Sequence, residues 1–243
     1  MLDLPSSPNS SDTLPPLFPG DAELARLNLV EGQLRPCGVR DPRILQAMGF
    51  LPRELFMPPP MAAAAYRDGP VEIAHGRYLM DCTLLARLIE AAEIRTEETV
   101  LDIAPATGYS SAVLASLARR VLALEGDPVL AERLKANMEK LQTQNVLLTE
   151  NLQKADWAIF KNCQVVLING VVDEIPAQIL DLLPEGGRIV ALVKRGDGAD
   201  AMTHPLAEAR LYVKRAGKAS FRVLFESQAP RATIFNRKTS FVF

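Results

Sequence analysis

The feature that most constrains the fold is an apolar run that enters a tight turn and then opens a helix. Residues 99–104 read as a buried strand, Gly108 lies in the turn, and the helix begins at Ser110. Such a unit sets backbone N–H groups and a helix N-terminus beside the carboxyl end of the strand. The next predicted strand, residues 120–125, ends in Glu125, 17 residues after Gly108. That spacing is typical of a carboxylate that binds ribose hydroxyls. Alone, the glycine is ordinary turn chemistry and Glu125 a solvated side chain; together they favour a nucleoside cofactor.

Strand and helix patterns alternate from residue 99 onward. We expect strands at 99–104, 120–125, 145–150, 163–169 and 188–194, and helices at 110–119, 128–141 and 176–183. This order predicts an α/β fold, a doubly wound and mostly parallel sheet with helices on both faces. Residues 210–215 and 221–225 alternate around a short turn, which predicts a C-terminal antiparallel hairpin. The closing residues 240–243 would add to that hairpin.

The N-terminal part of the chain has a different composition. Residues 1–20 are rich in Pro, Ser and Asp, and we expect them to be a disordered tail. Residues 21–243 are predicted to be a single domain. Within it, residues 21–80 would form an N-terminal helical lid and acceptor-side segment, and residues 81–243 the cofactor-binding core.

Three aspartates are predicted helix N-caps. Asp21 precedes an apolar periodic stretch at 22–34. Asp41 precedes Pro42 and the predicted helix at 43–48. Asp81 precedes a helix whose apolar face includes Leu84, Leu85 and Leu88.

Charge and cysteine content exclude several classes of protein. The formal charge of −2 gives no basic footprint for nucleic acid. Cys37, Cys82 and Cys163 are odd in number, widely spaced and without a CxxC pair, so we expect reduced thiols and neither disulfides nor bound metal. No stretch approaches ~18 uninterrupted apolar residues, and the N-terminus lacks a secretory-signal pattern. We therefore expect a cytoplasmic protein without a membrane partner; the sequence gives no oligomeric state.

Four separated blocks of the chain resemble the protein-L-isoaspartate O-methyltransferases, repair enzymes that use S-adenosylmethionine. The blocks are Val30-Glu31-Gly32-Gln33-Leu34-Arg35 with Pro52-Arg53-Glu54-Leu55-Phe56; Ala65-Tyr66-Arg67-Asp68 with His75-Gly76-Arg77-Tyr78-Leu79-Met80; residues 100–114; and residues 175–190. The four blocks together are specific evidence for this resemblance, whereas any single block would be weak evidence. The resemblance implies a class I methyltransferase, Rossmann-like fold and methylation of isoaspartyl carboxylates in damaged proteins.

The resemblance also assigns site residues. The loop from Asp102 to Gly108 would cradle the methionine moiety of the cofactor, Glu125 would bind the ribose, and Gly126-Asp127 would flank the adenine. The full cofactor-binding set that we predict is Asp102, Ala104, Ala106, Gly108, Tyr109, Glu125, Gly126, Asp127, Glu150, Asn151 and Asn169. The predicted catalytic and acceptor-side set is Met80, Tyr78, His75 and Asp68. S-adenosylhomocysteine would be the product.

The chain departs from the family pattern in that same site. Ala104 and Ala106 stand where the family has glycines, and an alanine disfavours positive φ. Met80 stands where the family has a hydroxyl residue, and methionine offers only a weak sulfur acceptor. The family's Thr-Ala-Ala after the fourth strand is here residues 169–171. These departures leave two alternatives open: the same cofactor with another acceptor, or a decayed module that binds a nucleoside or partner without chemistry.

Several single residues have plainer interpretations. His75 and Tyr78 are as consistent with structural hydrogen bonding and packing, and Asp68 with an exposed loop carboxylate. Asp102 is harder to dismiss, because a carboxylate within an apolar strand needs a partner. We expect it to face the cofactor.

Overall fold

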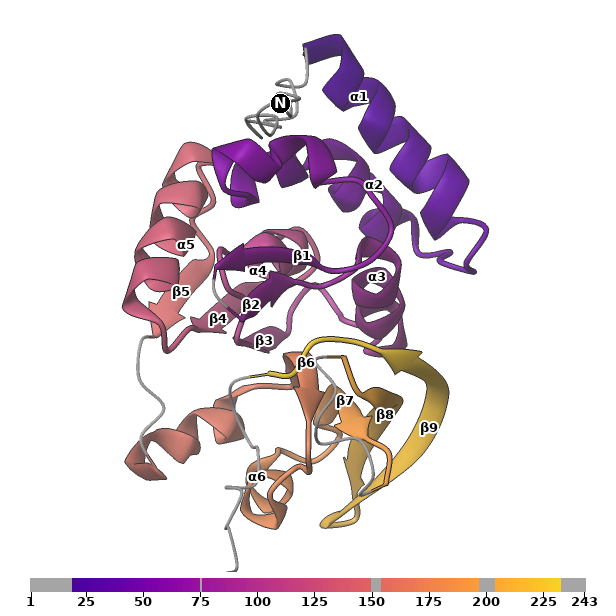
Figure 1. Cartoon of the computed structure of the whole chain (residues 1–243). Coiled ribbons are helices and arrows are strands. Elements are labelled where there is room, and N and C mark those ends of the chain that lie inside the picture. Colours follow the sequence, from indigo (N-terminus) through magenta and orange to yellow (C-terminus); the bar gives the residue numbers. More distant parts are fainter. Residues whose placement is uncertain (1–18, 75, 150–153, 197–203, 233–243) are drawn as a thin grey trace, which may run out of the picture.

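The computed structural model describes residues 19–74, 76–149, 154–196 and 204–232. Helical elements precede and alternate with the strands, as predicted (Figure 1). The helices are α1 Pro19–Asn28, α2 Pro42–Phe50, α3 Cys82–Ala91, α4 Tyr109–Ala115, α5 Pro128–Lys140 and α6 Ala177–Leu182. Further helical turns are η1 Leu29–Leu34, η2 Arg53–Phe56, η3 Pro59–Ala64 and η4 Lys154–Asn162. Of the tail predicted over residues 1–20, residues 1–18 lie outside the described residues. The prediction is wrong for Pro19 and Gly20, which are the first two residues of α1.

The main sheet has seven strands in the order β5-β4-β3-β6-β7-β8-β9. Its strands are β3 Thr99–Ile103, β4 Arg120–Leu124, β5 Val146–Thr149, β6 Val165–Val172, β7 Arg188–Lys194, β8 Leu206–Arg215 and β9 Lys218–Gln228. The five from β3 to β7 are parallel. β8 pairs antiparallel with β7 and β9 antiparallel with β8, which confirms the predicted hairpin and lengthens it at both ends. Residues 240–243 lie outside the described residues.

Helices cover both faces of the sheet, which confirms the doubly wound prediction. Side chains of α3, α4 and α5 share one core with alternate residues of the strands, such as Val100 and Val121. The intervening residues, such as Leu101 and Ile103, pack in a second core with α6 and η4. The alternation follows from the two-residue period of a strand. In Figure 1, α3 and α6 lie on opposite sides of β6 and β7.

Two of the three predicted N-caps are confirmed. The Asp41 side chain accepts from the N–H of Arg43, and the Asp81 side chain accepts from the N–H of Leu84. The prediction for Asp21 is wrong, because α1 begins at Pro19 and Asp21 lies within its first turn. A carboxylate in the first turn still favours the helix through its dipole. The predicted helix at 22–34 is α1 followed by the π-helical turn η1.

A second, two-stranded sheet lies apart from the main one. β1 Val71–Ala74 pairs antiparallel with β2 Arg77–Leu79, with an irregular register after Glu72. This hairpin leads into Met80 and α3, and Figure 1 shows it on the same side of the molecule as the N-terminal helices. It places two of the predicted acceptor-side residues, Tyr78 and Met80, at a cavity that Ala104 and Asn169 also line.

Candidate functional site

The loop after β3 keeps a glycine-type backbone although two of its residues are alanines. The φ angles of Ala104, Ala106 and Gly108 are +56°, +57° and +95°. Alanine disfavours positive φ, as expected, yet both alanines adopt it, at a strain of about 1–2 kcal/mol each. Gly108 has a second constraint, because a Cβ there would lie 2.7 Å from Cγ of Leu134 on α5. The loop conformation is thus preserved, with two added methyl groups.

Asp102, on β3, is fully buried and satisfied by the chain itself. Its Oδ2 accepts hydrogen bonds of 2.7 Å from the hydroxyls of Ser110 and Ser111, and its Oδ1 accepts one of 2.7 Å from Nδ2 of Asn169. Burial raises the pKa of this carboxyl to about 6, against the three hydrogen bonds that lower it. Asp102 therefore has the hydrogen-bond partners that a buried carboxylate needs, from the first turn of α4 and from Asn169 of β6.

Glu125 is almost entirely buried at the end of β4 and accepts four hydrogen bonds. Nη1 and Nη2 of Arg77 donate to Oε1 and Oε2 at 2.8 and 2.7 Å. The backbone N–H of Ala106 donates to Oε2 at 2.8 Å, and that of Asp127 donates to Oε1 at 3.0 Å. The expected ribose carboxylate is therefore held by a buried ion pair with β2. Our sequence analysis missed Arg77, since no local pattern joins it to Glu125.

The two predicted groups of residues meet at one narrow cavity. It is lined by Arg77, Tyr78, Met80, Ala104, Asn169, Gly170, Pro230, Arg231 and Ala232. The volume of this cavity that is open to the centres of water molecules is about 20 Å³, enough for one or two waters. A nucleoside cofactor needs a pocket of several hundred Å³. Ligand entry at this position therefore requires side chains at the mouth to move.

The C-terminal segment after β9 forms one wall of that cavity. The N–H of Val171 donates to the carbonyl of Pro230, and the N–H of Ala232 donates back to the carbonyl of Val171, both at 2.8 Å. Gly170, at φ +112°, permits this close approach, because a Cβ there would lie 2.7 Å from the backbone nitrogen of Ala232. The sequence analysis did not predict this contact, although it singled out residues 169–171 as a departure.

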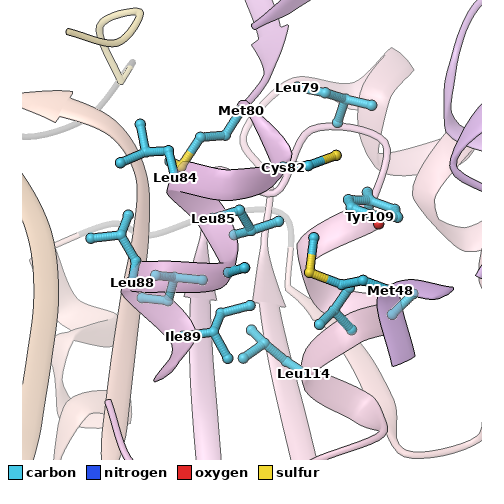
Figure 2. Close-up of a cluster of buried hydrophobic side chains, with 14 of the residues drawn as sticks. Met48, Leu79, Met80, Cys82, Leu84, Leu85, Leu88, Ile89, Tyr109 and Leu114 are labelled. Carbon is cyan, nitrogen blue, oxygen red and sulfur yellow. The ribbon is translucent and has the colours of Figure 1, made fainter. Parts of the chain in front are cut away.

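The side chains of three predicted site residues, Met80, Ala106 and Tyr109, lie in the hydrophobic core. Figure 2 shows Met80 and Tyr109 among the buried side chains around α3. The Tyr109 ring packs edge-on against Phe56, with centroids 5.3 Å apart, and its hydroxyl has no hydrogen-bond partner among the described residues. The Tyr109 side chain is therefore a core residue, and its predicted contact with the cofactor stays a prediction. Met80 is both a core residue and part of the cavity wall.

A buried arginine ties the acceptor-side segment to the loop after β3. Arg53 donates from Nε to the carbonyl of Ala65 at 2.8 Å and from Nη2 to the carbonyl of Met80 at 2.7 Å. Its guanidinium carbon lies 4.5 Å from the centroid of the Tyr109 ring, a cation–π contact. Arg53 therefore fixes the backbone of Met80 relative to α4. The Pro-Arg-Glu-Leu-Phe motif contained this residue, but its burial was not predictable.

The other predicted residues are placed as follows. Tyr78 is half-buried and packs edge-on against His204, with ring centroids 5.4 Å apart. Asp68 is exposed. The Asp127 side chain caps α5 by accepting from the N–H groups of Val129 and Leu130. Gly126 is exposed, with open space at its Cα. His75, Glu150 and Asn151 lie outside the described residues.

The residues at the strand ends fit the methyl-donor cofactor that the resemblance implies, with one rearrangement. The left-handed loop presents its backbone beside two buried carboxylates, Asp102 and Glu125, and Gly126 leaves open space next to them. What stands in the way is the Arg77 guanidinium on Glu125. Among the described residues, no group of three or more His, Cys, Asp or Glu side chains could hold a metal ion. Within the same residues, no helix is long and apolar enough to cross a membrane.

Comparison with known proteins agrees with this geometry. The family model described as Protein-L-isoaspartate(D-aspartate) O-methyltransferase (PCMT) matches residues 26–225. A protein-L-isoaspartate O-methyltransferase from Synechococcus sp. is 36% identical over 168 residues, which cover 69% of this chain and 69% of that protein. Another, from Syntrophobacter fumaroxidans, is 31% identical over 203 residues, or 80% of this chain and 95% of that protein.

Two solved structures share the fold. One described as a protein-L-isoaspartate O-methyltransferase has a TM-score of 0.69 at 23% identity, covering 86% of this chain and 66% of that chain. A Plasmodium falciparum protein described as a protein-L-isoaspartate O-methyltransferase, solved in complex with S-adenosyl-L-homocysteine, has a TM-score of 0.68 at 17% identity, covering 87% and 98%. At these identities they establish the fold alone.

These findings confirm the predicted class I methyltransferase fold, the transferase class and S-adenosylmethionine as the cofactor, and they do not favour the alternatives of another acceptor or a decayed module. The family acts on proteins that contain isoaspartyl residues. This chain belongs to the protein-L-isoaspartate(D-aspartate) O-methyltransferase family.

Proposed function

We propose that this chain transfers the methyl group of S-adenosylmethionine to the side-chain carboxylate of L-isoaspartyl residues in damaged proteins. The observation that carries the proposal is the left-handed backbone of the loop after β3, whose Ala106 N–H donates to the strand-end carboxylate of Glu125. That shape persists despite the alanines, which supports retention of a cofactor site rather than its decay.

In this proposal the ends of β3 and β4 hold the cofactor. Glu125 accepts from the ribose hydroxyls, and Gly126 and Asp127 flank the adenine. Asp102 orients the start of α4 and the end of β6 through Ser110, Ser111 and Asn169. Because the pKa of Asp102 is about 6, its carboxylate is mainly ionised at neutral pH and adds negative charge beside a cationic ligand.

The acceptor needs position more than activation. The bound cofactor supplies an electrophilic methyl group on a sulfonium centre. An isoaspartyl carboxylate, with a pKa near ~4, is ionised at neutral pH and needs no general base. Residues that line the cavity, Tyr78 and Met80 among them, would position its oxygen toward the methyl donor and exclude water. Held by Glu125, Gly126 and Asp127, the cofactor would supply the methyl group, and no side chain of the site would have to move a proton.

The division of the chain belongs to the same proposal. Residues 21–80 would be the acceptor-side lid and residues 81–243 the cofactor-binding core. Arg53 would join the two parts, since it contacts both the carbonyl of Met80 and the Tyr109 ring.

Mass spectrometry tests the proposal directly. The full chain is incubated with S-adenosylmethionine and a peptide that contains one isoaspartyl residue, and the product is fragmented to locate the methyl ester. We expect the ester at the isoaspartyl side chain and a strong loss of product with Glu125→Ala. A methyl group on another residue, or product formation unaffected by Glu125→Ala, would refute the proposed acceptor or the proposed site.

A further inference from the structure

We propose that Arg77 binds the carboxylate of the methyl acceptor, and that cofactor binding releases it for this task by taking its place on Glu125. The inference rests on the proposed function and deepens it. It assigns to this chain a cationic acceptor contact and an order of binding, with the cofactor before the protein substrate.

Glu125 has no acceptor capacity left while Arg77 is bound. A carboxylate offers about four lone-pair positions. In the structure all four are used, two by the Arg77 guanidinium and two by the backbone N–H groups of Ala106 and Asp127. The backbone donors belong to the loops that shape the site. Ribose hydroxyls can therefore bind Glu125 only if the guanidinium leaves.

The displaced guanidinium is already at the acceptor position. Arg77 lines the same cavity as Tyr78 and Met80, and Met80 stands where the resemblance implies a hydroxyl residue. Met80 cannot donate a hydrogen bond. A guanidinium binds carboxylates through two parallel N–H donors, the geometry that it already adopts with Glu125. A second guanidinium at the cavity, that of Arg231, donates to Asp173 at 2.9 Å.

The release of Arg77 needs no change in the main sheet. Among the described residues, β2 pairs with β1 alone, in a sheet separate from the seven-stranded one. The register between the two strands is irregular after Glu72, whose side chain accepts from the N–H of Gly76 at the turn. The side chains of Val71, Ile73 and Leu79 are buried in the core, so the exchange moves the Arg77 side chain rather than the whole hairpin.

This exchange of partners couples the two ligands. Once the cofactor takes Glu125, the guanidinium is largely enclosed without its anion, which is unfavourable. An acceptor carboxylate restores the pairing. Each ligand therefore raises the affinity for the other, as linkage requires.

The test uses Arg77→Gln, with Arg67→Gln as the matched control. Arg67 is an exposed arginine of the preceding segment, and its Nη2 donates at 3.3 Å to the carbonyl of Pro70. Calorimetry with S-adenosylhomocysteine measures the cofactor site without any acceptor. We expect Arg77→Gln to tighten this binding about fivefold or more, since the site no longer has to open. The KM for an isoaspartyl peptide should rise about 10-fold or more as the charged hydrogen bonds are lost.

Opposite shifts of the two affinities are the signature of the exchange, and loss of structure alone would weaken both. Arg77→Lys keeps the charge without the fork, so we expect a peptide KM between those of the wild type and Arg77→Gln. An unchanged peptide KM in Arg77→Gln, or weaker cofactor binding, overturns the inference and leaves the proposed function standing. Absence of wild-type turnover, despite cofactor binding, overturns the proposed function and this inference with it.

Discussion

Arg77 and Glu125 are 48 positions apart in the chain, yet they share two hydrogen bonds of 2.8 and 2.7 Å in a site where both side chains are largely enclosed. The pair joins the β1–β2 hairpin to the end of β4. Like the contact of Arg53 with the Tyr109 ring, it joins the N-terminal segment to the α/β core.

Removing both members of this pair should lower the free energy of unfolding by less than the sum of the two single removals. Glu125→Ala leaves a guanidinium and two backbone N–H groups without their acceptor, and we expect the free energy of unfolding to fall by about 3–5 kcal/mol. The double variant with Arg77→Met should lose at least about 0.5 kcal/mol less than the sum of the single variants. Urea denaturation of the four proteins measures this coupling; additive costs would show that the ion pair is not energetically coupled.

Asp102 should make the stability of the protein depend on pH. Its folded-state pKa, about 6, lies above the ordinary value of 3.8, so the folded protein binds more protons than the unfolded chain between these values. The contribution of Asp102 to the free energy of unfolding therefore falls as pH rises from about 4 to 6, by about 3 kcal/mol in total. Asp102→Asn should remove this contribution. Thermal unfolding of both proteins across this range provides the comparison, and parallel curves would contradict the assignment.

Restoring the family glycines should relax the loop. Ala104→Gly and Ala106→Gly each remove positive-φ strain of about 1–2 kcal/mol, which is partly offset by the greater freedom of glycine in the unfolded chain. We expect each variant to be about 0.5–1 kcal/mol more stable, and Ala104→Gly to bind S-adenosylhomocysteine more tightly because Ala104 lines the cavity. Ala112→Gly, inside α4, is the control and should be destabilising. Loss of stability at all three positions would contradict the strain argument.

A hydroxyl side chain at position 80 should speed methyl transfer and lower the stability of the folded protein. A hydrogen bond to an anion is worth roughly 1.5–3 kcal/mol, so Met80→Ser is expected to raise the rate of isoaspartyl methylation by about 10-fold to 150-fold. The same change removes a buried side chain and should lower stability by about 2–4 kcal/mol. Met80→Leu keeps the volume without a donor and should not accelerate the reaction. Equal rates for the two variants would mean that the missing hydroxyl is not what limits transfer.

Much of the fold was predictable because it depends on local pattern. The run from Thr99 to Ile103 could only be a buried strand, and the alternation after it required a parallel sheet with helices on both faces. The hairpin at the C-terminus followed from two-residue alternation around Gly217. The start of α1 was misplaced, since Asp21 resembles an N-cap but lies in the first turn.

The site was only partly predictable, because its decisive contacts are long-range. Asp102 was predicted because it is a carboxylate within an apolar strand, and Glu125 because it ends the next strand. Their actual partners, Ser110, Asn169 and Arg77, depend on which strands and hairpins become neighbours in space. The positive φ angles at Ala104 and Ala106 run against local propensity and are imposed by the surrounding loop.

Methyl transfer with a radiolabelled donor, measured on an isoaspartyl peptide and on its aspartyl twin, tests the central claim most directly. The two peptides differ only in which carboxyl group forms the main-chain amide bond. We predict turnover on the isoaspartyl peptide and essentially none on the aspartyl one, with the label lost in Glu125→Ala. Equal labelling of the two peptides, or none of either while the cofactor binds, would contradict the assignment of isoaspartyl carboxylates as the acceptor.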